Sequence, residues 1–132
     1  MKRFNGTILL IVIIFTQSAL ANQENSLDKI KNAIQIGSVK EVMNLLHNNS
    51  EINIENKIIK GRNNETEILL KNFFYNNPSI EMDLIHEGKT NNKITYILAN
   101  YKTINDNFKI IVFVKKISEN SKIDRLIINK EK

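Results

Sequence analysis

The apolar pattern of this chain changes its period at Pro78, and that change constrains the fold more than any other feature. Before Pro78, apolar residues recur mainly at helical spacing, whereas after it they recur at every second position. A period of two predicts four strands, at residues 79–87, 93–103, 107–117 and 122–130. The connections between these segments are short and polar, which favours a meander of antiparallel hairpins.

Two helices are predicted at the start of the domain. Ser26 is suited to be the N-cap of a first helix, and Gly37 ends its apolar stripe. Ser38 and Glu41 form a capping-box pattern, which starts a second helix directly after the first. The stripe of this second helix extends to Leu46, so the two helices should form a helical hairpin or elbow.

A short strand and a third helix are predicted before Pro78. Residues 47–50 break the helical stripe, and Ile52 and Ile54 then alternate with polar residues as in a strand with one buried face. Residues 60–64 read as a turn, in which Asn63 or Asn64 caps a helix over residues 65–75. The order of elements predicts an α+β fold, with N-terminal helices packed on a strongly curved antiparallel sheet.

The first residues have the pattern of a secretory signal peptide. Lys2 and Arg3 precede an apolar run from Ile8 to Phe15, and an Ala-Leu-Ala sequence ends at Ala21. We therefore expect cleavage after residue 21, export to the periplasm or medium, and no stable membrane span afterwards. An uncleaved anchor is the alternative, although the run is shorter than the roughly 20 residues that span a bilayer.

Composition excludes several classes of function. The chain has no cysteine, so disulfides, thiolate catalysis and cysteine–zinc sites are impossible. Its two histidines lack the spacing of a helical metal site, and no glycine-rich phosphate loop is present. The net charge of +5 falls by two when Lys2 and Arg3 are removed, and the remaining lysines are scattered. We expect no nucleic-acid partner, no metal and no cofactor.

Four segments carry a resemblance to a known family: "IKNAIQIGSVKEVMNLL", "ILLKNFFYNNP", "LIHEGKTNNKITYILANYKT" and "FKIIVFVKK". Together they resemble a family of small exported bacterial proteins that is known only as a domain of unknown function. The family has the nuclear transport factor 2-like architecture of the cystatin-like superfold. The resemblance implies one cone-shaped domain over residues 22–132, and it implies no catalytic residues.

His86 and Tyr96 are the weak candidates for catalytic residues. His86 is in phase with Met82 and Leu84, which predicts that it faces the helix-covered side of the sheet. Tyr96 on the next strand would be a hydrogen-bonding partner. Enzymes of the resembled fold place such residues in the cone cavity as general acids or bases. Asp83 falls on the opposite face, which separates a carboxylate from the histidine.

A structural role for His86 is the alternative. A single histidine in phase with core residues is usually held by a hydrogen bond to a backbone carbonyl or to a neighbour such as Tyr96. Gly88 suggests a turn with positive φ after the strand, rather than a loop around a substrate. His47 follows a helical stripe, where a positive charge near the helix C-terminus is favoured. We read His47 as structural too.

Two further features suggest binding surfaces. Aromatic residues could line a ligand pocket or simply belong to the core; they are Phe73, Phe74, Tyr75, Phe108 and Phe113. Phe73 and Phe74 are adjacent on a helix and cannot point at one spot, so either both pack in the core or one faces a cavity rim or a partner. An outer sheet face with a large apolar patch would favour a homodimer. The residues that we expect on that outer face are Ile97, Ala99, Tyr101, Ile111 and Phe113.

The leading functional prediction is an exported, non-catalytic binding module for a small apolar ligand or an envelope protein. Its basis is a complete fold pattern without a paired acid and base. The alternative is a small-molecule enzyme of the isomerase or dehydratase type, with His86 as general base in the cone cavity and Tyr96 as hydrogen-bond donor.

Overall fold

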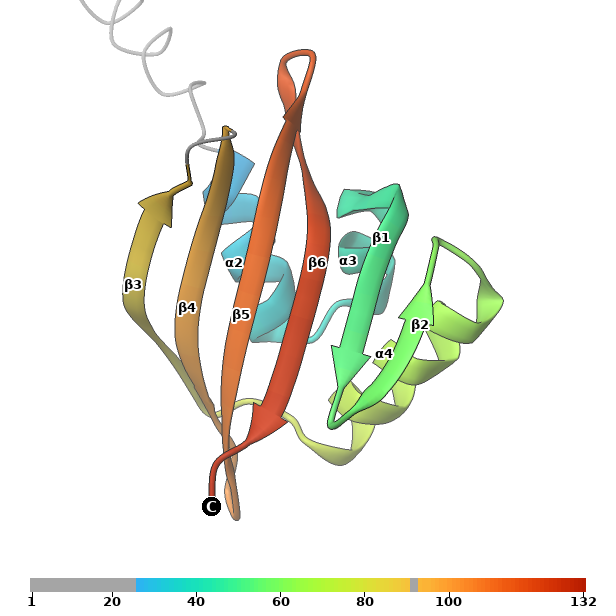
Figure 1. The fold of residues 1–132 in the computed structure, drawn as a ribbon. Helices are drawn as coiled ribbons and strands as arrows, with labels where there is room; N and C mark the ends of the chain where they lie inside the picture. Colours follow the sequence, from blue (N-terminus) through green and yellow to red (C-terminus); the bar gives the residue numbers. More distant parts are fainter. Residues whose placement is uncertain (1–25, 91–92) are drawn as a thin grey trace, which may run out of the picture.

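The computed structural model describes residues 26–90 and 93–132 of the chain. In this part, three helices cover one face of a six-stranded sheet, and none covers the other face (Figure 1). The helices are α2 (Ser26–Ile36), α3 (Val39–Leu45) and α4 (Asn64–Asn76). The predicted α+β arrangement of helices on a curved sheet is confirmed. The predicted signal peptide, residues 1–21, lies outside the described residues.

The sheet contains six strands in the order β2-β1-β6-β5-β4-β3. They are β1 (Leu46–Ile54), β2 (Lys57–Lys60), β3 (Glu81–Lys89), β4 (Ile94–Lys102), β5 (Asn107–Ile117) and β6 (Asn120–Lys130). Strands β3 to β6 form the predicted antiparallel meander. Strand β1 pairs parallel with β6, because the chain returns to β1 only after α4 and the whole meander. The sheet bends around the helices and does not close (Figure 1).

The turn between α2 and α3 follows from local chemistry. The backbone N–H of Gly37 donates to the carbonyl of Ile34 at 3.1 Å, and that of Ser38 donates to Ala33 at 3.0 Å. This pair of bonds is a Schellman C-cap, whose left-handed residue, Gly37, has φ +69°. The Oγ of Ser38 then accepts from the backbone N–H of Glu41 at 3.2 Å and caps α3. The predicted helical elbow is confirmed.

Helix α4 is capped by Asn63, one of the two predicted candidates. Its Oδ1 accepts from the backbone N–H of Thr66 at 3.0 Å. At the other end, the backbone N–H of Asn77 donates to the carbonyl of Phe73 at 2.9 Å, and Pro78 follows at once. The helix therefore ends where proline restricts the residue before it.

The prediction for residues 47–64 was wrong in two respects. Residues 47–50 do not interrupt the structure, because β1 begins directly after α3 at Leu46. Strand β2 was missed, and it pairs with β1 through a tight turn at Glu55 and Asn56, which have φ +50° and +72°. Turns with positive φ at both central residues match the twist of a hairpin, and asparagine tolerates that conformation.

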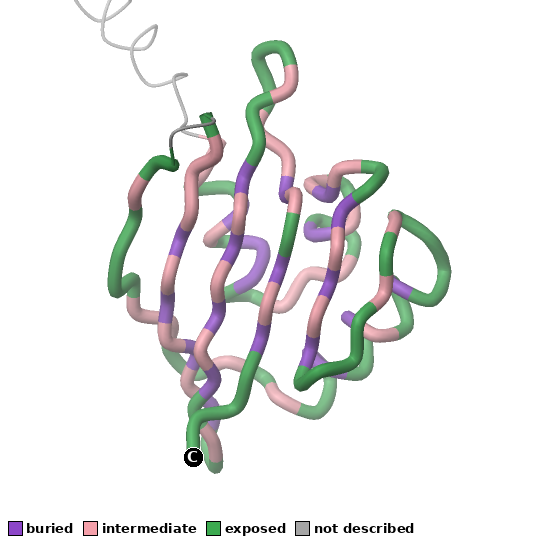
Figure 2. The backbone as a smooth tube through the Cα atoms, viewed as in Figure 1, coloured by how far each residue is buried: buried purple, intermediate pink, exposed green. Residues whose placement is uncertain are grey.

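The prediction for the faces of β4 was also wrong. Ile97, Ala99 and Tyr101 lie on the helix-covered face and are almost fully buried, not on the outer face. The alternate residues, Tyr96 and Leu98, lie on the outer face instead. Both sets of β4 residues are largely apolar, so a period of two could not decide which set is buried. Figure 2 shows the resulting alternation of buried and less buried residues along the central strands.

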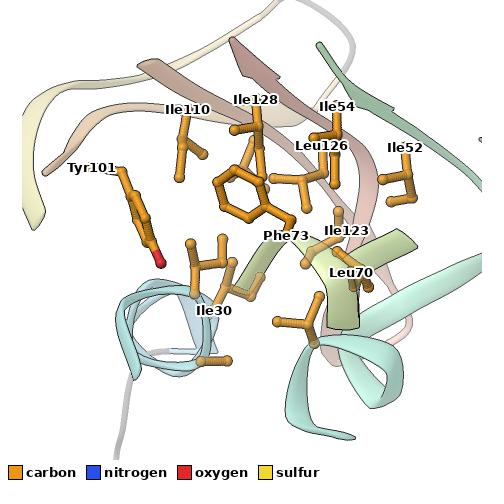
Figure 3. Close-up of a cluster of buried hydrophobic side chains, with 14 of the residues drawn as sticks. Ile30, Ile52, Ile54, Leu70, Phe73, Tyr101, Ile110, Ile123, Leu126 and Ile128 are labelled. Carbon is orange, nitrogen blue, oxygen red and sulfur yellow. The ribbon is translucent and has the colours of Figure 1, made fainter. Parts of the chain in front are cut away.

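The core lies between the helices and the inner face of the sheet. Ile30 of α2 and Leu70 of α4 are fully buried, and they point toward Ile110, Leu126 and Ile128 of the sheet (Figure 3). Strands β5 and β6 supply alternate apolar residues to this layer, as their period predicted. The central strands are therefore held by burial of one face, while no helix of the described residues covers their other face.

Candidate functional site

A β-bulge in β3 decides where His86 lies. Leu84 pairs with Ala99, but His86 pairs with Leu98, so β3 advances by two residues where β4 advances by one. The extra residue, Ile85, reverses the phase of the strand. The prediction that His86 faces the helices was therefore wrong, because His86 follows the bulge and shares the outer face with Leu98.

The residues around His86 confirm this reversal. Glu87 now faces the helices, where its carboxylate lies 3.7 Å from the ammonium of Lys31 on α2. His86 is exposed, and its ring lies 5.4 Å from that of Tyr96, which pairs with Gly88 on the same outer face. The predicted hydrogen bond between His86 and Tyr96 is not present among the described residues, where the two side chains meet only as neighbouring rings. His86 and Tyr96 lie on the outer face, whereas the cavity in which they would act as an acid–base pair was expected on the helix-covered face.

Gly88 has a different role from the one predicted. It lies inside β3 and does not have the positive φ of a turn glycine. A Cβ at this position would lie only 2.7 Å from the hydroxyl oxygen of Tyr96. Gly88 therefore makes room for the Tyr96 ring to lie across the edge strand.

Aromatic side chains fill part of the helix-covered interior, where a cone cavity was expected to hold His86 and Tyr96. The Phe73 ring packs against Tyr101, with 5.6 Å between the ring centroids, and edge-on against Phe108, with 5.1 Å between the centroids. The Tyr101 hydroxyl donates to the carbonyl of Asn77 at 2.6 Å. Burial raises the pKa of Tyr101 from 10.0 to about 12, partly offset by a hydrogen bond from the Ser79 backbone. Folding thus favours the neutral phenol, and its contribution to stability is lost as pH rises from 10.0 toward about 12.

A groove opens at the end of this core, beside the aromatic cluster. We call it the mouth groove, and it has a volume of about 520 Å³. It lies between the α2–α3 turn, the last turns of α4 and the segment that leads into β3. Phe73 and Phe74 are both almost fully buried and both belong to the core, and Phe74 also lines the groove. The structure therefore shows core packing for the pair, and neither ring is exposed at a rim.

Three exposed apolar side chains gather around the mouth groove. Tyr75 is 84% exposed, Ile80 65% and Ile36 63%, and all three line it. Tyr75 was among the aromatic residues that could line a pocket, whereas Ile36 and Ile80 were not expected there. A signal was present: Ile36 falls off the buried stripe of α2, and Tyr75 and Ile80 flank Pro78, where no helical or strand stripe would bury them.

The polar groups of the mouth groove are few. Lys71 lines it and makes no ion pair within the described residues. The Oγ of Ser79 is buried and has no hydrogen-bond partner among the described residues. Gln35 and the hydroxyl-bearing Tyr75 and Tyr101 also line the groove, and no aspartate, glutamate or histidine of the described chain does. The described lining therefore combines apolar and neutral polar groups with one cation, and it holds no carboxylate or imidazole that could act as a general base.

Two other kinds of feature are absent from the described part of the chain. No group of three or more His, Asp or Glu residues there is placed to hold a metal ion. No helix there is long and apolar enough to cross a membrane.

The position of His86 predicts a small effect of its removal. Because its side chain is exposed and contacts mainly the Tyr96 ring, His86→Ala should lower the free energy of unfolding by less than about 1 kcal/mol. Phe73→Ala, which empties the centre of the aromatic cluster, should cost about 3–5 kcal/mol. Urea unfolding followed by circular dichroism measures both. A loss for His86→Ala that approaches the loss for Phe73→Ala would contradict the outer-face position.

Solved structures share this fold. A DUF4783 family protein from Bacteroides fragilis matches with a TM-score of 0.70 and 25% identity, over 78% of this chain and 96% of that one. A cystatin-like domain of unknown function from Nostoc punctiforme gives 0.64 and 14%, over 81% and 74%. A protein from Shewanella baltica described as ntf2-like gives 0.59 and 13%, over 81% and 89%. The last two likenesses show the fold alone.

The sequence itself was compared with curated proteins and with family models. No curated protein matches it. One family model matches residues 27–129, which is most of the chain and all of the helices and strands except their outermost residues. The resemblance noted in the sequence is thereby confirmed, for both the family and the fold. This chain belongs to the family described as Domain of unknown function (DUF4783).

Proposed function

We propose that the protein is an exported, non-catalytic module that binds a small apolar ligand in the mouth groove. One observation carries the proposal: three exposed apolar side chains converge on one groove whose lining holds a lysine and no acidic group. Exposed apolar side chains that gather at a concave site are typical of binding surfaces. The volume of about 520 Å³ is within the range of small-molecule sites.

The lining also indicates the chemistry of the ligand. Ile36, Tyr75 and Ile80 offer apolar contacts, and Lys71 offers one positive charge. A ligand with an apolar body and one negatively charged end matches both features. Dodecanoate, a short fatty acid, is a simple example of this class.

The residues of this groove support catalysis less well than they support ligand binding. Its titratable groups are Lys71, Tyr75 and Tyr101. The raised pKa of Tyr101, about 12, keeps its phenol protonated, and its hydroxyl already donates to Asn77. The isomerase or dehydratase alternative needs His86 as a general base in the cavity, and His86 lies on the other face of the sheet.

Export is part of the proposal and rests on the sequence of residues 1–21. Cleavage after Ala21 would leave a chain that begins at Asn22. The intact mass of the protein isolated from its own cells checks this step. The expected mass corresponds to residues 22–132, and a mass that includes Met1 would contradict export by cleavage.

A second candidate is self-association through the outer face of the sheet. The corrected apolar stripe on this face consists of Tyr96, Leu98, Ile111, Phe113 and Ile127, which lie next to one another in the strand register. All five are only half-buried, because no described helix covers them. An uncovered apolar stripe of this kind fits the centre of a protein interface.

Charge complementarity favours a second copy as the partner on this face. The β3 edge carries Glu81 and Asp83, which share the single Lys102. Toward the opposite edge, Lys60 and Arg125 flank the single Glu51 in the strand register. A two-fold axis parallel to the strands would place the acidic edge of one copy over the basic edge of the other.

Ligand binding is tested with anilinonaphthalene sulfonate, a fluorescent probe that has apolar rings and one negative charge. Ile36→Asp should raise its dissociation constant about tenfold, because burial of one isoleucine contributes roughly 1.5–3 kcal/mol. Ile68→Asp is the matched control, since Ile68 is also an exposed helical isoleucine but lies outside the groove. Dodecanoate should displace the probe. Equal affinities of the two variants, or no displacement, would reject the mouth groove as the site.

Self-association is tested by sedimentation equilibrium at micromolar concentration. The unmodified protein should have the mass of a dimer, and Phe113→Lys should have the mass of a monomer because it buries a charge at the centre of the stripe. Ile104→Lys is the control, since Ile104 is 81% exposed in the β4–β5 turn, outside the stripe. A monomer mass for the unmodified protein would refute the dimer. Circular dichroism establishes that each variant is folded.

A further inference from the structure

A second groove, at the opposite end of the sheet from the β4–β5 turn, has a different chemistry. It has a volume of about 390 Å³ and is lined by His47, Arg62 and Lys122, together with the amides of Asn48 and Asn120. We propose that this cationic groove binds the phosphate-type dianionic group of a small molecule. This site is independent of the mouth groove, with which it shares no lining residue.

The groove exists because β1 leaves the regular ladder as it begins. Leu46 pairs with Ile123 of β6, but the next pair is Glu51 with Arg125. Between these two pairs, β1 advances by five residues and β6 by two, so residues 47–50 bulge out of the ladder with β6. Bulges often lie beside functional sites because they aim side chains out of the regular sheet. This bulge presents His47 and Asn48 to the space between β1 and the β5–β6 hairpin.

The backbone that carries Arg62 is held in place by three hydrogen bonds. The N–H of Gly61 donates to the carbonyl of Ser50 in the β1 bulge at 2.8 Å. The hydroxyl of Thr66 donates to the carbonyl of Gly61 at 2.6 Å, and the backbone N–H of Thr66 donates to Asn63 at 3.0 Å. The loop is thus ordered before any ligand arrives, which lowers the entropy cost of binding.

The Arg62 side chain itself is not engaged. It is exposed and makes no ion pair within the described residues. A guanidinium presents two parallel N–H donors that match two oxygens of a phosphate group. Arg62 is therefore the principal anion contact in the proposal.

His47 and Lys122 each have hydrogen-bonding capacity left for a ligand. The Nδ1 of His47 accepts from the backbone N–H of Asn49 at 3.2 Å, so the proton of the neutral ring is on Nε2. The ammonium of Lys122 donates one hydrogen bond to the carbonyl of Asn44 at 2.7 Å, which leaves two N–H donors. Each of these hydrogen bonds orients its side chain, and N–H donors of His47 and Lys122 remain for a ligand.

The charge balance of the groove favours an anion with more than one negative charge. Arg62 and Lys122 are cationic, and no carboxylate is among the lining residues. Glu119, at the tip of the β5–β6 hairpin, lies close in sequence but does not line the groove. Leu46 and Ile117 supply apolar walls that strengthen charge–charge attraction by excluding water. The rest of the groove leaves room for the organic part of a phosphorylated molecule.

The proposal is tested by titrating the purified, isotope-labelled protein with pyrophosphate and following backbone amide signals by NMR. Signals of residues 46–48, 62 and 117–122 should shift together. Arg62→Gln should raise the dissociation constant about tenfold or more, because it removes a charged, two-donor contact. Lys40→Gln, which removes an exposed cation of α3 outside both grooves, should leave it unchanged. Acetate at the same concentration should shift these signals far less than pyrophosphate.

A second arm of the experiment distinguishes a free phosphate compound from a lipid headgroup. The protein is sedimented with vesicles of phosphatidylglycerol and, as control, of phosphatidylcholine. Loss of both pyrophosphate and vesicle binding in Arg62→Gln supports the groove with a lipid headgroup as ligand. Pyrophosphate binding without vesicle binding supports a soluble phosphate compound. Pyrophosphate affinity that is equal in Arg62→Gln and Lys40→Gln, or equal shifts with acetate, would overturn the proposal.

Discussion

The contact of Phe73 with Tyr101 and Phe108 is the interaction on which the other features of this structure depend. It joins α4 to the inner face of β4 and β5, and it is the only place where three aromatic rings meet in the described part of the chain. Phe74, the next residue of α4, packs edge-on against Phe73, is also almost fully buried, and lines the mouth groove. The Tyr101 hydroxyl then holds the end of α4 through Asn77. One packing event thus orders the core and shapes a surface site.

Both grooves lie where regular structure ends. The mouth groove forms where α2 and α4 stop, and apolar residues there no longer belong to a buried stripe. The cationic groove forms where β1 departs from the ladder with β6. Interior positions of helices and strands have their backbone groups paired and their side chains committed to packing. The ends and bulges leave side chains free, so the candidate binding chemistry of this small domain is concentrated at them.

Much of the fold followed from residues whose effects are local. The Gly37–Ser38 turn, the Asn63 cap and the end of α4 before Pro78 were predicted correctly, since each depends on neighbours within four residues. The site was harder to predict. His86 was predicted on the wrong face because no residue type in the sequence marks the bulge at Ile85. A single extra residue then reverses the face of every later side chain in the strand. Strand β2 escaped notice because four residues are too few to show a period.

By itself, the sequence determined the three helices of the described chain, the antiparallel meander and the family, because period, caps and turn residues act over short distances. Only the tertiary structure decided which face of β4 is buried. Its two faces are almost equally apolar, and the choice depends on the helix that covers one of them. The period alone would also allow Tyr96 and Leu98 to be the buried set. That set continues to Asn100 and Lys102, however, which packing excludes from the interior. Long-range packing also decided the grooves, since each is lined by segments that are distant in the chain and meet only after folding.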